Sequence, residues 1–132
     1  MNASTPTAHD ERSVAELTAP MLAKDLWVAI ATSTGSPEAL ADVLQAHLER
    51  MIELEEQGVL FASGPLLDDD GAVRGDGITI IRAAGRAEAE EIVASDPLVA
   101  AGLRTVELRR WRIMEGRISV TLDFATGGYA IE

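Results

Sequence analysis

The feature that most restricts the fold is a long amphipathic helix predicted over residues 37–57. Ser36 can cap its first free N–H groups, Pro37 suits the first helical position, and Gly58 is a typical stop. Apolar residues recur along it at spacings of three and four, so one side must be buried against another layer. These residues are Leu40, Val43, Leu44, Leu48, Met51, Ile52 and Leu54.

Short apolar runs surround this helix and predict strands. A second helix is expected over residues 87–95, where Asp96-Pro97 should end it. The order is then strand, helix, strand, strand, helix, strand, which is the ferredoxin-like βαββαβ arrangement of an α+β protein. It predicts an antiparallel sheet with two helices on one face, and burial of the other face predicts a homodimer. The strands before the second helix are expected at 26–32, 59–66 and 78–83.

The C-terminal residues predict an appended hairpin strand. Ile118, Val120, Leu122 and Phe124 alternate with polar residues, as in a strand with one buried face. A two-residue turn at Glu115-Gly116 would pair this strand with the one before it. That register fails beyond residue 110 unless one residue is extra, which predicts a β-bulge at Arg109-Arg110.

Length and composition set the domain organisation and exclude several functions. We expect an N-terminal extension over residues 1–25, partly disordered or helical, with its first 12 residues as a mobile tail, and one α+β domain over residues 26–132. The net charge of −11 argues against binding to nucleic acid or an anionic membrane. No signal peptide or long apolar run is apparent, so a cytoplasmic protein is expected.

No motif indicates a metal or a cofactor. The chain has no cysteine and only two histidines, so a zinc cluster has no support. The run Asp68-Asp69-Asp70 lacks both key carboxylates of an EF-hand and is expected to be a solvated loop, followed by turn residues at 75–77. No phosphate-binding glycine motif is present.

Five residues are candidates for a site, and each has a purely structural alternative. His47 lies beside the apolar stripe, where it is either a general base or a core-edge histidine bonded to backbone. Asp96 either orients that imidazole or only ends a helix. Ser63 and Gly64 either meet a ligand or simply end a strand. Arg110 either binds an anionic substrate or pairs with carboxylates on neighbouring strands.

The run from Gly64 to Gly71 resembles the YCII-related family. The same pattern continues through residues 88–97, 101–103 and 106–111, and it includes a histidine on the first helix. The resemblance implies a ferredoxin-like fold that dimerises as an α+β barrel, with a His–Asp pair falling on His47 and Asp96. The best-defined chemistry among such proteins is dehydrochlorination of a chlorinated hydroxyquinol.

These observations lead to two functional hypotheses. The first is a cofactor-independent lyase or isomerase, in which His47 and Asp96 remove a proton from a small oxygenated ring or acid. The second is a non-catalytic protein that binds a small molecule in the same pocket. The histidine is expected to be essential for turnover in the first case and to affect only affinity in the second.

Overall fold

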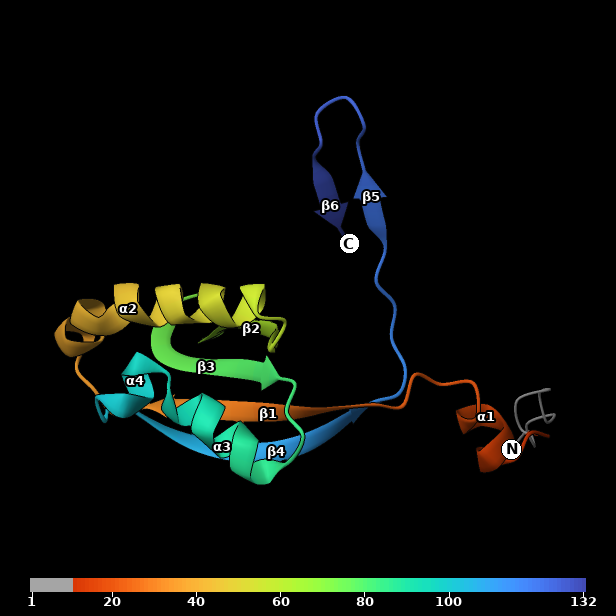
Figure 1. The fold of residues 1–132 in the computed structure, drawn as a ribbon, viewed down its shortest axis with the longest axis horizontal. Coiled ribbons are helices and arrows are strands. Elements are labelled where there is room, and N and C mark those ends of the chain that lie inside the picture. The colour runs from red at the N-terminus through yellow and green to blue at the C-terminus, as the bar shows by residue number, and fades with distance from the viewer. Residues whose placement is uncertain (1–10) are drawn as a thin grey trace, which may run out of the picture. The chain divides into compact units, whose positions relative to one another are not determined.

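The computed structural model describes residues 11–132, whose contacts divide into two compact units. The larger unit, residues 25–112, contains the sheet and three helices (Figure 1). The predicted order of strands and helices is confirmed, with one short helix added. The elements are β1 (Lys24–Ser33), α2 (Pro37–Glu56), β2 (Leu60–Leu67), β3 (Val73–Ile81), α3 (Arg86–Ala94), α4 (Pro97–Ala100) and β4 (Arg104–Ile113).

The four strands form one sheet in the order β2-β3-β1-β4. Strand β3 pairs antiparallel with both neighbours, so that Ile81 lies opposite Trp27 of β1 and Leu60 of β2. Residues 75–77, expected in a turn, belong instead to β3 and pair in part with β1. The predicted ferredoxin-like α+β fold is confirmed in this sheet and its covering helices.

The core lies between the sheet and the helices. In β1 the buried residues Trp27, Ala29 and Ala31 point toward the helices, and the residues between them point to the other face of the sheet. Ile81 and Ala89 complete the cluster around Trp27, and both are fully buried. From α2, Met51 and Leu54 are buried against the same face, so α2 and α3 share one side of the sheet.

The long helix begins and ends where the sequence predicts. The Ser36 hydroxyl accepts the N–H of Ala39 at 3.2 Å, and Gly58 follows the helix with a φ of +72°. The predicted stripe, however, is only partly buried. Leu44, Leu48 and Ile52 remain 47%, 50% and 55% exposed, because they lie at the edge of the helix that the sheet does not cover.

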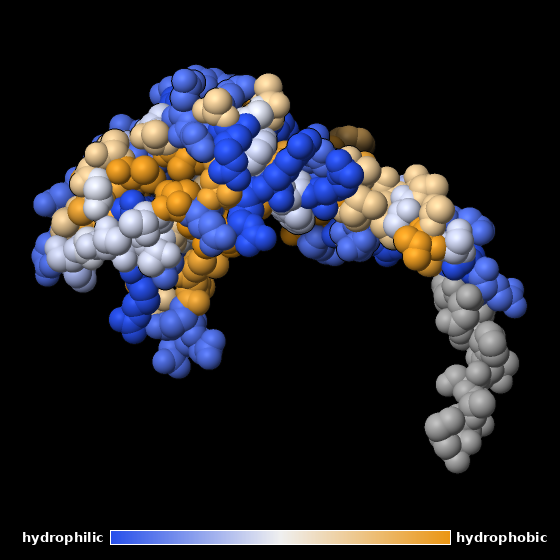
Figure 2. Space-filling model, turned by 90° about the horizontal axis from the view of Figure 1, so that it is seen from below, coloured by the Kyte–Doolittle hydropathy of each residue, from blue (hydrophilic) through white to orange (hydrophobic). Residues whose placement is uncertain are grey.

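The opposite face of the sheet is aliphatic. Val28 pairs with Ile80 and Ile30 pairs with Ile78, so these four side chains share the side away from α2 and α3. All four are half-buried. Apolar atoms also reach the molecular surface between hydrophilic side chains in the view of Figure 2.

Among the described residues, the smaller unit comprises 11–24 and 113–132. Helix α1 (Val14–Thr18) begins with a capping box, in which the side chains of Ser13 and Glu16 each accept the other's backbone N–H. Strands β5 (Val120–Leu122) and β6 (Tyr129–Ile131) form a separate two-stranded sheet. Residues 1–10 of the predicted tail lie outside the described residues.

The predicted hairpin register at the C-terminus is wrong. Val120 pairs with Ile131 and Leu122 with Tyr129, so the partner of β5 is β6 and not β4. A backbone hydrogen bond closes the turn between β5 and β6: the carbonyl of Asp123, which follows β5, accepts the N–H of Gly127 at 2.9 Å. Gly127 has a φ of +68°, which a glycine adopts easily. The β-bulge inferred at Arg109-Arg110 depended on the rejected register and is rejected with it.

No helix within residues 11–132 has the length and apolar character needed to cross a membrane.

Candidate active site

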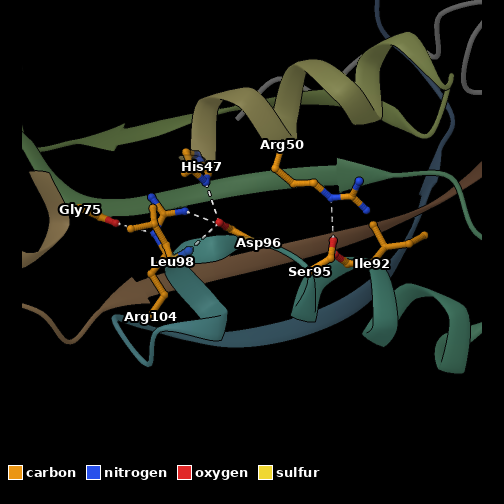
Figure 3. A network of polar contacts seen from close by, with 8 residues as sticks. All are labelled: His47, Arg50, Gly75, Ile92, Ser95, Asp96, Leu98 and Arg104. Atoms are coloured by element: carbon orange, nitrogen blue, oxygen red, sulfur yellow. Dashed lines mark hydrogen bonds and ion pairs between the residues drawn. The ribbon is translucent and has the colours of Figure 1, made fainter. Parts of the chain in front are cut away.

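His47 and Asp96 lie in direct contact (Figure 3). The Nδ1 of His47, on α2, lies 2.7 Å from Oδ1 of Asp96, which precedes α4. Both side chains are mostly enclosed, with 13% of His47 and 8% of Asp96 exposed. A short charge-assisted contact in such surroundings is much stronger than one on the open surface.

Asp96 is held by more than the histidine. Its Oδ1 also accepts the N–H of Leu98 at 2.9 Å, which makes Asp96 the N-cap of α4. Pro97 occupies the first position of that helix, where its missing N–H costs nothing. The second oxygen, Oδ2, lies 3.7 Å from Nη1 of Arg104. The carboxylate is therefore fixed in orientation from three sides.

This arrangement selects one tautomer of His47. An ionised carboxylate can only accept hydrogen bonds, so the Nδ1–H donates to Asp96. The lone pair of the neutral ring is then on Nε2, which makes no hydrogen bond to another residue in the described chain. A ring held in this way can take a proton from a bound molecule.

A cavity of about 690 Å³ opens beside His47, between α2 and the β2–β3 edge of the sheet. That volume falls within the range usual for small-molecule sites, about 300–1,000 Å³. Its wall is mostly apolar, with a few polar groups among the aliphatic side chains. The lining includes Leu40, Leu44, His47, Leu48, Met51, Ser63, Gly64, Pro65, Arg74, Thr79, Leu98 and Arg104.

The family model of the YCII-related domain matches residues 23–112, which include the whole His–Asp site and the sheet. The chain belongs to the YCII-related family. The family predicted from the sequence is confirmed.

A solved structure similar to this YCII-related chain is the 5-chloro-2-hydroxyhydroquinone dehydrochlorinase from Burkholderia phenoliruptrix AC1100, in complex with 2,5-dihydroxybenzoquinone. The two are 26% identical, with a TM-score of 0.54. The match covers 65% of this chain and 92% of the dehydrochlorinase. Among curated proteins, none matches this chain.

The structure brings four of the five sequence candidates to this part of the YCII-related domain. Ser63 and Gly64 line the cavity with His47, and Asp96 lies directly behind the imidazole. The Ser63 hydroxyl makes no hydrogen bond to another described residue. Arg110 is placed elsewhere: its Nη2 donates to Asp25 at 2.8 Å, and its guanidinium lies 5.9 Å from the Trp27 ring.

Arg104 is the functional candidate that the sequence analysis missed. It begins β4, lines the cavity, and has only 9% of its side chain exposed. Its Nε donates to the carbonyl of Gly75 at 3.0 Å (Figure 3). The sequence did contain a signal: Arg104, Val106 and Leu108 occupy every second position of a strand and so share one face. This spacing places a cation on an otherwise apolar face.

Arg50 supports the site from one turn further along α2. Its Nε donates to the hydroxyl of Ser95 at 3.0 Å, and its Nη1 pairs with Glu53. Ser95 immediately precedes Asp96, so this bond ties the start of α4 to the helix that carries His47. Helix α2 and the Asp96 turn are thereby held together at two points.

The acidic loop before β3 is closed by its own backbone. Asp68 accepts the N–H groups of Ala72 and Asp70 and the Nε of Arg74. These hydrogen bonds lower the pKa of Asp68, and the bond from the Ala72 N–H has the largest effect, with that from Arg74 second. Its oxygens are engaged in the loop, and the described residues contain no group of three His, Cys, Asp or Glu side chains placed to hold a metal.

Proposed function

We propose that this protein is a small-molecule enzyme of the lyase or isomerase type, in which His47 is the general base. The observation that carries the proposal is the 2.7 Å contact between Nδ1 of His47 and Asp96, at the wall of an open cavity. Asp96 orients the ring and stabilises the imidazolium that forms when Nε2 takes a proton. A merely structural histidine would not need a neighbouring cavity.

The chemistry begins with a proton on carbon or oxygen of a small oxygenated ring or acid. Nε2 of His47 takes that proton, and the electron pair left behind forms a new double bond within the substrate. If an adjacent carbon carries a leaving group such as chloride, the group departs with its bonding electrons. If it does not, the imidazolium returns the proton to another atom and gives an isomer. Both outcomes are redox-neutral, so the reaction is proposed to proceed without a cofactor.

The structural similarity supports the elimination route in particular. The dehydrochlorinase that matches over 92% of its length removes hydrogen chloride from a chlorinated hydroxyquinol. Ser63 lines the cavity and its hydroxyl bonds to no other described residue, so it would bind a substrate oxygen, and Gly64 beside it allows close approach. The aliphatic face formed by Val28, Ile30, Ile78 and Ile80 supports a homodimer that covers it.

The proposal is tested by turnover of a defined panel. Chloride release from 5-chloro-2-hydroxyhydroquinone is measured first, and other small oxygenated ring acids are then followed by proton NMR. The wild-type protein, His47→Asn and Gln45→Asn are compared; Gln45 lies on the same helix but is exposed. Conversion by wild type and Gln45→Asn, slowed about 100-fold or more in His47→Asn, is the expected result.

Equal rates for wild type and His47→Asn would overturn the general-base role. If the wild-type protein binds panel compounds but converts none of them, the non-catalytic hypothesis replaces the proposed function. Melting temperatures of all three proteins ensure that a lost rate does not reflect lost fold.

A further inference from the structure

The ionisable side chains that line the cavity are all basic, although the chain as a whole is acidic. The formal net charge is −11, yet the ionisable residues that line the cavity are His47, Arg74 and Arg104, with no Asp or Glu among the described lining residues. An enclosed concave surface with one sign of charge concentrates ligands of the opposite sign. A lining of this kind favours a ligand of negative charge.

The two arginines differ in what they can offer a ligand. The Nε of Arg74 donates to Asp68 at 3.0 Å, and its side chain is 71% exposed, so this charge is mostly neutralised at the rim. Arg104 is mostly buried, and the carboxylate nearest to it, Asp96, is already bonded to His47 and Leu98. Arg104 is thus the cation that an enclosed ligand would meet.

The guanidinium of Arg104 is anchored at one nitrogen and open at the other two. Nε donates to the Gly75 carbonyl at 3.0 Å. Nη1 is 3.7 Å from Asp96 Oδ2, which is an ion pair but too long for a hydrogen bond. Neither Nη1 nor Nη2 donates a hydrogen bond to any residue among 11–132. Nη2 fits close to Gly77 because glycine has no side chain: a Cβ at residue 77 would lie 3.2 Å from Nη2 of Arg104.

We propose that Arg104 is the anion-binding residue of this cavity and that the ligand is a small ring acid. An anionic group with its charge spread over two oxygens matches the two free guanidinium nitrogens. The carbon skeleton of the acid then lies against Leu44, Leu48 and Met51, which gives the exposed leucines of α2 an apolar partner. This inference deepens the proposed function and rests on it, because the bound acid is the substrate that His47 deprotonates.

The test compares benzoate with benzamide, which has nearly the same shape but no charge. Binding of each to the full-length protein is measured by isothermal titration calorimetry, with inorganic phosphate as a competitor that lacks a ring. We expect the wild-type protein to bind benzoate at least about tenfold more tightly than benzamide. Phosphate should compete only weakly, because it cannot use the apolar wall.

Variants then assign the preference to one side chain. Arg104→Gln should abolish the benzoate preference, and Arg104→Lys should retain part of it, because lysine keeps the charge but not the planar fork. Arg109→Gln is the matched control: Arg109 lies on the same strand, is exposed, and pairs with Glu107. It should bind both compounds as the wild-type protein does.

Three results would overturn the inference: no binding of benzoate by the wild-type protein, no preference over benzamide, or an unchanged preference in Arg104→Gln. Melting temperatures show whether each variant is folded. If Arg104→Gln is not, the wild-type selectivity and the Arg104→Lys variant decide the question. Because binding does not need turnover, a benzoate preference that persists in His47→Asn, with no turnover by the wild type, would reject the proposed function and leave the anion site standing.

Discussion

The carboxylate of Asp96 joins His47 to the start of a helix through one atom. Its Oδ1 lies 2.7 Å from Nδ1 of His47 and 2.9 Å from the backbone nitrogen of Leu98. The atom that orients the imidazole is therefore also the atom that caps α4. Any displacement of α4 would move the carboxylate away from the ring, so the local fold and the proposed chemistry depend on each other.

Two substitutions at Asp96 separate these roles. Asparagine caps helices as well as aspartate does, so Asp96→Asn should retain most of the stability and lose turnover. Asp96→Ala should lose turnover and also about 2 kcal/mol of unfolding free energy, because the Leu98 N–H loses its buried partner. Urea unfolding monitored by circular dichroism measures the difference. Equal stability of the two variants would contradict the capping role.

Gly75 is expected to tolerate no side chain. Its φ is +96°, and an added Cβ would lie 2.8 Å from Leu40 and Ser33. Gly75→Ala should therefore cost about 1–3 kcal/mol and displace the carbonyl that holds Arg104. Gly64→Ala is the control, because Gly64 has open space and no positive φ. It should leave stability unchanged or slightly raised, and any loss of ligand binding in it would assign Gly64 to the ligand.

The pKa of Asp25 makes a small part of the stability dependent on pH. Hydrogen bonding to Arg112, with the charges of Arg112 and Arg110, lowers that pKa from 3.8 to about 2. A lowered pKa in the folded protein stabilises it above the unfolded value, so the contribution is present above pH 4 and is lost as pH falls toward 2. Asp25→Asn should lower the melting temperature slightly at pH 7, and the difference should shrink through this interval.

Asp42→Asn is the control for that experiment, since it removes one negative charge from an exposed position of α2. It corrects for the general effect of reducing the net charge of −11. Because the Asp25 pairs are solvent-accessible, added salt should weaken their effect. A difference that stays constant from pH 7 to pH 2.5 would show that the ion pairs contribute nothing.

The proposed dimer is checked by mass. Sedimentation equilibrium should give twice the chain mass of 14.0 kDa, because association would bury the aliphatic side of the sheet. Dilution should shift the population toward the single chain with a cooperative change in stability. A mass of 14.0 kDa at every concentration would reject the dimer.

The sheet and its helices were predictable because their signals are local. The cap at Ser36, the stop at Gly58 and the alternation in β1 depend on neighbours within a few residues. The C-terminal hairpin was mispredicted although its alternation is clear, because two partner strands fit a period of two. Asp123 and the glycines at 127–128 decide between them, and they close the turn between β5 and β6.

The site was predictable only in part for a related reason. His47 and Asp96 were found through the family pattern, whereas their 2.7 Å separation depends on how α2 meets α4. Arg104 carries no motif, and its importance appears only when β4 lies beside β1 and Gly75 supplies a carbonyl. Arg110 has equally suggestive neighbours in the sequence, but the fold pairs it with Asp25 instead.

Every catalytic step proposed for the cavity depends on the tautomer of His47. Long-range ¹H–¹⁵N correlation spectra of the folded protein distinguish the two ring nitrogens, and the missing signals in His47→Asn assign them. The predicted result at pH 8 is a proton on Nδ1 and a lone pair on Nε2, with the Nδ1 proton shifted by its bond to Asp96. A proton found on Nε2 instead would leave the ring without a base directed at the cavity, and the catalytic role of His47 would be contradicted.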